Sequence, residues 1–434
     1  MDRLGLTGIA FRLRVVFTRG VGSVLQFGLN VLLGRLLGPA GAGVYFLFSS
    51  WVRTLSVASN LGLPLSVLRE LSIARQQGRH ADARATVRGA VVSTLVVGGI
   101  VVAAVVAFGP QAARWLGDPA ATQLVRLSAL GALLFALRRV QTEALKAYGQ
   151  PAFAVAVDSP LLAAGLIATV GLAATLGPLT AMVPVYAFLG VNVALLALGA
   201  WRFRDALGAE EARDAPVPSR IRGPARARYL LWGVAVASIV STEAPFLVLP
   251  RFATEAEVGT FGAAFRLVAL ATTLMGALAA TFGPRFAQAY AAGHAAALRR
   301  ALLRSQGASL LLYAPFAVAY IAAPRWVLGW FGDGFAEGAQ VLLILVVAQI
   351  VDAATGLSGY VLTMTGAERT LLALTAAGFV VFIASVAVLG PRLGVEGVAV
   401  SFAAMLTVRS VAVYWAAVRR SRVAAPAPAD GPTP

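Results

Sequence analysis

Several residue types are scarce or missing in this chain of 434 residues, and each absence excludes a kind of chemistry. The chain has no cysteine, which excludes disulfides and thiol chemistry. Lys146 is the only lysine and no Gly-Lys-Ser/Thr sequence occurs, which excludes the phosphate loop of nucleotide hydrolases. The only histidines, His80 and His294, fall in expected loops, so a histidine-based triad or metal centre within a membrane is excluded too.

Charge is also scarce. Charged residues make up 13% of the chain, against about 25% in a typical soluble domain, and the mean hydropathy is +0.80. Apolar runs of about 20 residues recur along the sequence, long enough to cross a hydrocarbon layer of roughly 30 Å. The alternating segments of about ten residues that are typical of barrels do not occur. The sequence therefore predicts an all-α polytopic membrane protein.

We expect about twelve transmembrane helices. They are predicted at 14–36, 43–67, 89–109, 122–146, 153–175, 180–201, 229–250, 258–283, 302–323, 339–363, 370–389 and 394–418.

The net charge of +17 is distributed in a way that favours a membrane over nucleic acid as the partner. Lys and Arg alternate between rich and poor connectors, with 24 in one set and 5 in the other. Connectors rich in Lys and Arg stay on the cytoplasmic side of a membrane. Both termini are therefore predicted to be cytoplasmic, and nucleic acid is not expected to bind.

Matching phrases about half a chain apart indicate an internal repeat. RWLGD at 114–118 recurs as GWFGD at 329–333, Gly43 matches Gly259, and Leu-Gly-Pro at 176–178 recurs at 389–391. Two six-helix units inserted in the same direction are related by an axis along the membrane normal, and such repeats place a central cavity and substrate site between them. We expect Asp118 and Asp333, in these phrases, to begin the helices that follow.

The repeat divides the chain into four parts. They are a six-helix lobe at 1–201, a basic cytoplasmic linker at 202–228, a second six-helix lobe at 229–419 and a disordered cytoplasmic tail at 420–434.

Polar residues inside the predicted spans are the candidate functional residues. Arginine at mid-membrane costs at least about 2.5–3.5 kcal/mol, so it is expected to face water or a partner. Two polar stripes follow helical spacing on the first two spans, and Arg266 lies on the eighth. The stripes consist of Arg19, Ser23, Gln26 and Asn30, and of Ser49, Arg53, Ser56 and Asn60. A cavity richer in arginine than in acid favours an anion, and the guanidinium fork suits phosphate.

Alternatives remain open for most of these residues. Arg19 lies near a helix end and could instead reach the headgroups, while Gln26, Asn30 and Asn60 could be interhelical hydrogen-bonding groups rather than ligand contacts. The acids Glu243, Asp352 and Asp158 are candidates either for a coupling-ion site or for salt bridges to arginine. Arg139 and Glu143 have the i, i+4 spacing of a structural ion pair.

The segment GRLLGPAGAGVYFLFSSWVRTLSVASNLGLPLSVLREL at 34–71 resembles the N-terminal part of bacterial polysaccharide flippases. The shared features are Arg-apolar-Leu-Gly-Pro at Arg35–Pro39, then Gly43 and the aromatic Tyr45, then Leu-Gly-Leu-Pro at Leu61–Pro64. The family is the oligosaccharide-lipid flippase branch of the multidrug/oligosaccharidyl-lipid/polysaccharide (MOP) exporter superfamily, which also contains the MATE transporters.

The resemblance implies two lobes around a cavity, alternating access, and cationic residues on the first, second and eighth helices, which Arg19, Arg53 and Arg266 match. It also implies translocation of a polyprenyl-diphosphate-linked oligosaccharide across a bacterial cytoplasmic membrane, for O-antigen, capsule or exopolysaccharide. Expected partners are this lipid-linked oligosaccharide, membrane lipids, and a polymerase and glycosyltransferases of the pathway.

Three other functions compete with this expectation. A multidrug exporter of the same superfamily binds organic cations and would need acids in its cavity, where arginine is in excess. A glycan polymerase or ligase would need catalytic groups on a large outer loop, but the predicted outer loops are short. A major-facilitator carrier would show Gly-x-x-x-Asp-Arg-x-Gly-Arg, which RELSIARQQGRHADAR lacks. We therefore expect a transporter rather than an enzyme, with no cofactor and with H⁺ or Na⁺ coupling left open.

Overall fold

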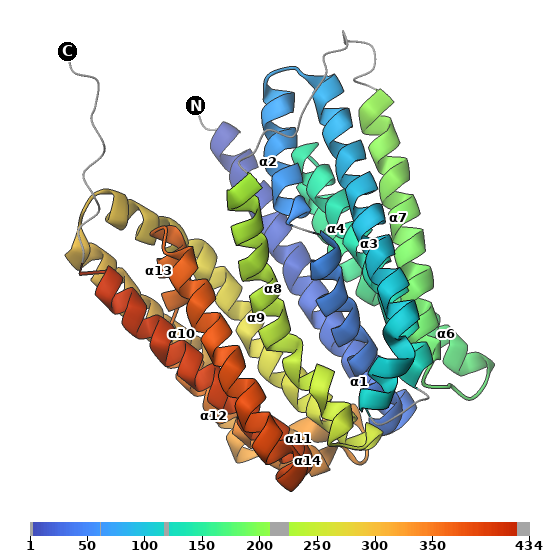
Figure 1. Ribbon diagram of the computed structural model, residues 1–434. Coiled ribbons are helices and arrows are strands. Elements are labelled where there is room, and N and C mark those ends of the chain that lie inside the picture. The colour runs from blue at the N-terminus through green and yellow to red at the C-terminus, as the bar shows by residue number, and fades with distance from the viewer. Residues whose placement is uncertain (1–2, 61, 117–120, 209–224, 423–434) are drawn as a thin grey trace, which may run out of the picture. The chain divides into compact units, whose positions relative to one another are not determined.

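The computed structural model describes residues 3–60, 62–116, 121–208 and 225–422, and this part of the chain is helical without any strand (Figure 1). The expected all-α polytopic membrane fold is confirmed. Asp118 and most of the predicted linker and tail lie outside the described residues.

The helices begin and end at the following residues. They are α1 Arg3–Asn60, α2 Leu63–Gln76, α3 His80–Leu116, α4 Ala121–Ala147, α5 Pro151–Asp158, α6 Pro160–Leu176, α7 Val183–Gly208, α8 Ala225–Val248, α9 Glu255–Ala291, α10 Ala295–Ala322, α11 Pro324–Leu328, α12 Ala339–Thr355, α13 Ser358–Met364 and α14 Glu368–Arg420. Short 3₁₀ turns lie at Leu249–Arg251, Gly329–Phe331 and Phe335–Gly338.

Glycine kinks and helix breaks relate these helices to the predicted spans. Helix α1 is kinked at Gly38, whose φ of 67° is a conformation that favours glycine, and Pro39 follows it. Helix α14 is kinked in the same way at Gly394, with φ of 57°. Each of these long helices therefore contains two predicted spans, whereas α5 with α6, and α12 with α13, each form one span that is broken in the middle.

Seven stretches of the described residues are long and apolar enough to cross a membrane, and two of them, Phe17–Asn60 and Glu368–Arg420, contain the kinked double spans. The predicted spans that correspond to α4, α8 and α9 fall outside these seven stretches. Those three helices carry the charged residues Arg138, Glu243 and Arg266.

The helices form two compact units. The first comprises Met1–Gly259 with Phe331–Asp333, and the second comprises Thr260–Trp330 with Gly334–Pro434. In the first unit α4 packs against α1, α3 and α7, and α8 packs against α1. In the second, α12 packs against α10 and α14. Both units have apolar cores, built around residues such as Val140 in the first and Phe286 in the second. The lobe boundaries at 201 and 229 stay a prediction.

Asp333 does not begin the helix that was expected to follow it. It is exposed, a 3₁₀ turn intervenes at Phe335–Gly338, and the residue that precedes α12 is Gly338. That prediction was wrong because the connector contains an extra turn, permitted by Gly334 with φ of 84°. Trp330, beside it, is 37% exposed and makes an edge-to-face contact with Trp326.

Gly43 and Gly259, which the repeat relates to each other, make a reciprocal close contact inside the first unit. A Cβ on Gly43 would collide with the carbonyl oxygen of Glu255, and a Cβ on Gly259 would collide with that of Pro39. Small residues at such a crossing let two helix backbones approach closely. This contact holds the start of α9 against the kink of α1.

We predict that Gly259→Ala lowers the free energy of unfolding by about 1–3 kcal/mol, because the added methyl group has no room. Thermal denaturation of the purified protein measures the change. Gly276→Ala on the same helix is the matched control, since no atom lies within 4 Å of the Cβ that it adds. Equal melting temperatures for the two variants would contradict the prediction.

Candidate functional site

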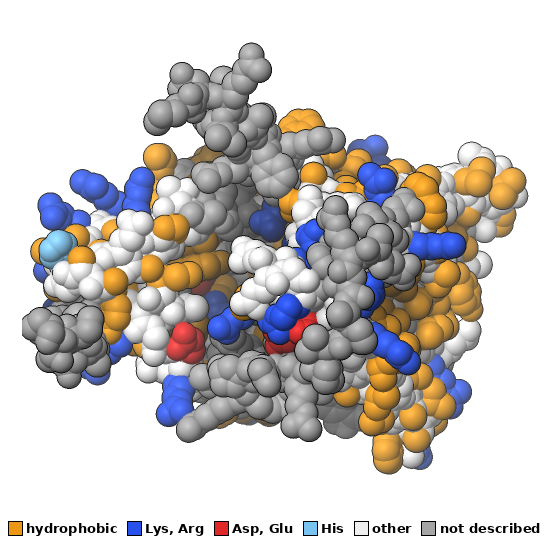
Figure 2. Space-filling model, turned by 90° about the horizontal axis from the view of Figure 1, so that it is seen from above, with side chains coloured by type: hydrophobic (Ala, Val, Ile, Leu, Met, Phe, Trp, Pro, Cys, Tyr) orange, Lys and Arg blue, Asp and Glu red, His pale blue; other side chains and the backbone are white. Residues whose placement is uncertain are grey.

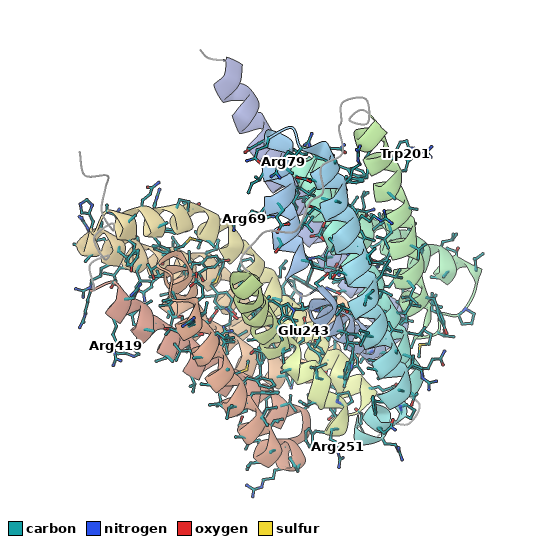
Figure 3. All side chains as sticks on the ribbon, turned by 45° about the horizontal axis from the view of Figure 1, so that its top comes forward. Arg69, Arg79, Trp201, Glu243, Arg251 and Arg419 are labelled. Carbon is teal, nitrogen blue, oxygen red and sulfur yellow. The ribbon has the colours of Figure 1, made fainter. Side chains whose placement is uncertain are left out.

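Arg53 and Glu243 form an ion pair within the first unit. Arg53 lies on the second arm of α1, which follows the kink at Gly38. Its partner Glu243, labelled in Figure 3, lies on α8, 190 residues away in sequence. Arg53 Nε donates to Glu243 Oε1 at 2.6 Å, and Nη2 donates to Oε2 at 3.3 Å. The two planar groups therefore meet in the forked geometry that gives the strongest arginine–carboxylate pairs.

The two partners differ in burial. The Glu243 side chain is 5% exposed and that of Arg53 is 32% exposed. A carboxylate buried this far needs a cation, because an isolated charge in a low-dielectric interior is strongly unfavourable. The hydrogen bonds that Arg53 makes with described residues use Nε and Nη2, and none uses Nη1. Glu243 is thus held by Arg53, while part of the guanidinium stays accessible.

Helix α8 is also hydrogen-bonded to α1 at a residue one turn beyond Arg53. Trp232 Nε1 donates to the carbonyl oxygen of Val57 at 2.9 Å. Pro245, two residues beyond Glu243, cannot donate a backbone hydrogen bond, so the helix at this point lacks one of its own bonds. The helix interior thus carries a carboxylate beside a proline.

The polar stripe on the second arm of α1 is mostly satisfied locally. Ser49 donates to the carbonyl oxygen of Phe46 and Ser56 to that of Arg53, as hydroxyls on helices commonly do. Asn60 is buried, and its Oδ1 has no hydrogen-bond partner among the described residues. Of this stripe, Arg53 and Asn60 keep polar capacity that the helix itself does not use.

The residues of the polar stripe on the first arm of α1, before the kink at Gly38, differ in how far they are buried. Arg19 is exposed, Gln26 is half-buried and Asn30 is buried. Ser23 donates to the carbonyl oxygen of Arg19. Both alternatives for Arg19, cavity lining and headgroup contact, are compatible with this exposure.

Arg266 lies half-buried on α9 in the second unit, with its Nε buried. The expected apposition of Arg53 and Arg266 across a cavity joins residues of different units and stays a prediction.

Asp352 in the second unit also lies beside an arginine. Its Oδ1 accepts a hydrogen bond from Ser410 and lies 3.6 Å from Arg409 Nη2, while its Oδ2 accepts one from Gln349 at 3.1 Å. Asp352 comes from α12 and its two main partners from α14. This geometry favours the salt-bridge alternative for Asp352 over the ion-site alternative.

Asp158 lies at the break between α5 and α6, beside the buried Arg138; the sequence analysis left pairing with an arginine open for Asp158 but did not indicate which arginine. Arg138 on α4 is fully buried, and its Nη1 donates to the carbonyl oxygens of Val157 and Asp158 at 2.6 and 2.9 Å. Helix α5 ends at Asp158, and the last carbonyl oxygens of a helix have no partner within it, so the break leaves those of Val157 and Asp158 for Arg138. Arg138 therefore binds the broken backbone; the signal in the sequence was the proline that follows Asp158 and Ser159.

Glu143, finally, is paired with Lys146 rather than with the expected Arg139. Lys146 Nζ donates to Glu143 Oε1 at 2.6 Å, while Arg139 is exposed. The i, i+4 expectation was wrong because an i, i+3 partner lies on the same helix face.

Solved structures with similar folds are MOP-superfamily transporters. One is an inward-facing multidrug resistance MATE family transporter, with TM-score 0.77 and 18% identity over 92% of this chain and 94% of that one. An outward-facing multidrug resistance MATE family transporter matches with TM-score 0.65 and 15% identity over 94% of this chain and 95% of that one. A MOP superfamily transporter from Pyrococcus furiosus, described as having a binding pocket of reverse polarity, matches with the same values. The chain is therefore a multi-pass membrane protein with the MATE transporter fold.

The sequence identifies the family. The chain belongs to the polysaccharide biosynthesis protein family, which it matches over residues 15–290. This confirms the resemblance drawn from residues 34–71. No curated protein matches the chain in sequence.

We predict that Arg53→Gln lowers the free energy of unfolding by about 2 kcal/mol, because it removes the forked ion pair from the buried carboxylate of Glu243. Adding Glu243→Gln should restore most of the loss, since the uncompensated charge is then gone. Thermal denaturation of the single and double variants measures the coupling. Arg126→Gln, at an exposed position on α4, is the control and should be nearly neutral. Additive effects of the two substitutions would contradict an energetically coupled pair.

Proposed function

We propose that this protein translocates a polyprenyl-diphosphate-linked oligosaccharide from the inner to the outer leaflet of the bacterial cytoplasmic membrane by alternating access. The oligosaccharide would serve O-antigen, capsule or exopolysaccharide synthesis. Membership of the polysaccharide biosynthesis family and the transporter fold support this proposal.

One observation carries the proposal further than family and fold. Arg53 is placed within a span, held by Glu243 on one edge, and 32% exposed. A guanidinium in this position offers its remaining donors to phosphate oxygens, which suit its planar fork. The diphosphate of a lipid carrier would compete with Glu243 for Arg53 while the polyprenyl tail stays in the bilayer.

The pairing of Arg53 adds a requirement that a free cation would not have. When a phosphate takes Arg53, the buried carboxylate of Glu243 gives up its forked hydrogen bonds to the guanidinium, a loss that a proton or another cation at Glu243 would offset. Substrate binding and uptake of H⁺ or Na⁺ at Glu243 would then be linked. Glu243 would form the salt bridge with Arg53 before substrate binds and would hold the coupling ion afterwards. The two alternatives for this acid would then be successive states of one residue.

The membrane potential favours this direction of transport. With the inside negative, moving one negative charge outward lowers its free energy by about 2.3 kcal/mol per 100 mV. The proposed orientation puts both termini in the cytoplasm. In Figure 2 the visible face carries many Lys and Arg side chains and few acids, as expected for a cytoplasmic face. A polymerase and glycosyltransferases of the same pathway are proposed partners.

The second candidate is a multidrug exporter, which the fold of the solved structures favours. A cation exporter would use Glu243 rather than Arg53 to bind its substrate. The two proposals therefore assign opposite roles to the two members of the ion pair.

We predict that Glu243→Gln supports polysaccharide export while Arg53→Gln/Glu243→Gln does not. Both variants lack the buried acid, so the comparison isolates the positive charge of Arg53 without an unpaired carboxylate. Export is measured in a strain that lacks the gene, with equal membrane abundance of each variant verified. The double variant should export at least about tenfold less, the loss of one charge-assisted hydrogen-bonded contact.

Full export by the double variant would overturn the anion-binding role of Arg53. Loss of export in Glu243→Gln alone, at normal abundance, would make ion exchange at Glu243 essential to export and not only linked to substrate binding. Drug resistance that depends on Glu243 would favour the multidrug exporter.

We predict that Asp352→Asn retains export and costs some stability, because Asp352 serves Arg409 and Ser410 as a partner. The same export assay and a melting curve measure both effects. Loss of export from a variant of normal abundance would assign Asp352 to ion coupling instead.

A further inference from the structure

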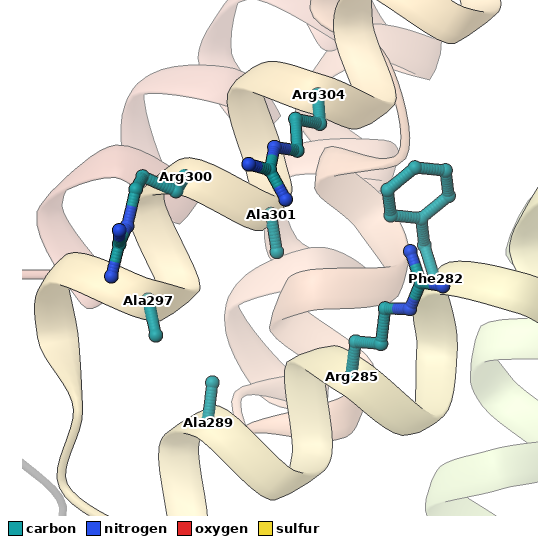
Figure 4. Close-up of a pocket in the computed structure, with 7 residues that line it drawn as sticks. All are labelled: Phe282, Arg285, Ala289, Ala297, Arg300, Ala301 and Arg304. Atoms are coloured by element: carbon teal, nitrogen blue, oxygen red, sulfur yellow. The ribbon is translucent and has the colours of Figure 1, made fainter.

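A basic pocket lies between the ends of α9 and α10, within the second unit and apart from the ion pair of the proposed function. Its volume is about 320 Å³. Figure 4 shows the two helices side by side, with residues of both directed to the space between them. The pocket is lined by Phe282, Arg285 and Ala289 of α9 and by Ala297, Arg300, Ala301 and Arg304 of α10.

Helical spacing explains why these residues share one pocket. Arg300 and Arg304 are one turn apart on α10, on the side where Ala297 and Ala301 lie, so the arginines project beside small neighbours. Ala289 is the small residue on the opposite helix. The three alanines leave room between the helices, and the three arginines line this room with donors.

The pocket is not neutralised by its surroundings. All three arginines are exposed, no acid is among the described residues that line the pocket, and the sequence from 281 to 305 contains no acid. The corresponding hairpin of the other repeat differs, because α2 carries Glu70 and α3 carries Asp82, whose Oδ2 accepts a hydrogen bond from Arg79 at 2.6 Å. Of these two hairpins, the one between α9 and α10 has no acid to pair with its arginines.

Contacts with the rest of the second unit hold the α9 side of the pocket in place. The Arg285 guanidinium lies 5.4 Å from the centre of the Phe282 ring, in the geometry of a cation–π contact. Phe282 belongs to the apolar core of the second unit. Arg420 Nη2 at the end of α14 donates to Tyr290 Oη of α9 and to the carbonyl oxygen of Thr365, which fastens the end of α9. The hairpin thus holds its cationic residues on a packed base.

We propose that this pocket binds a phosphate group through Arg285, Arg300 and Arg304. Each guanidinium can donate two parallel hydrogen bonds to phosphate oxygens, and three of them match the charge of a phosphate or diphosphate. The phosphate could belong to the headgroup of an anionic membrane lipid or to free diphosphate in solution. The proposal does not depend on transport, because binding to the pocket is measured directly.

The test titrates inorganic pyrophosphate into the full-length protein in a neutral detergent at low ionic strength, followed by calorimetry. Arg300→Gln/Arg304→Gln should bind pyrophosphate at least about tenfold more weakly, because two charge-assisted contacts are lost. Arg299→Gln/Arg419→Gln is the matched control, since it removes two exposed arginines of the same unit that do not line the pocket. Melting curves verify that both variants fold.

A second arm separates the two sources of phosphate. The protein is reconstituted in nanodiscs of phosphatidylcholine with or without phosphatidylglycerol, and pyrophosphate binding is measured again. Weakened binding in the presence of phosphatidylglycerol assigns the site to a lipid headgroup, and unchanged binding assigns it to free phosphate. Equal losses in the pocket variant and the control, or absence of pyrophosphate binding to the native protein in detergent, would overturn the proposal.

Discussion

The forked ion pair between Arg53 and Glu243 is the interaction on which the proposed site depends. Neither charge is tolerable alone in a helix pair surrounded by hydrocarbon, yet together they satisfy each other. The pair requires α1 and α8 to lie side by side, and a second hydrogen bond from Trp232 to Val57 holds the same contact. The kink at Gly38 and the glycine contact of Gly43 with Gly259 then set the direction in which the arm that carries Arg53 runs.

The same pair explains how a site can be both stable and available. A guanidinium that is one-third exposed keeps donors for an anion while its carboxylate partner keeps it in place. Under the proposed function, an arriving phosphate exchanges with a carboxylate that already binds Arg53. In the same proposal, this exchange links the anionic substrate to a proton or sodium ion at Glu243.

Hydropathy was sufficient to predict the all-α membrane fold, and helical spacing indicated Arg53 as a candidate site residue. They could not predict its partner, because Glu243 is 190 residues away and no local pattern joins the two. Helical spacing also predicted the wrong ion pair where two basic residues lay near one acid, because Glu143 pairs with Lys146 and not with Arg139. Arg138 could not be understood from its own helix, because the carbonyl oxygens that it binds become free only at the break between α5 and α6.

The central claim is that the transported group is an anion on a lipid. Its most direct test is translocation in proteoliposomes, with a polyprenyl-diphosphate oligosaccharide compared with the same oligosaccharide on a polyprenyl glycoside that lacks the diphosphate. The account predicts that the protein accelerates translocation of the diphosphate form only, and faster when the potential drives negative charge toward the receiving leaflet. Equal translocation of both lipids, or of neither while organic cations are transported, would contradict it.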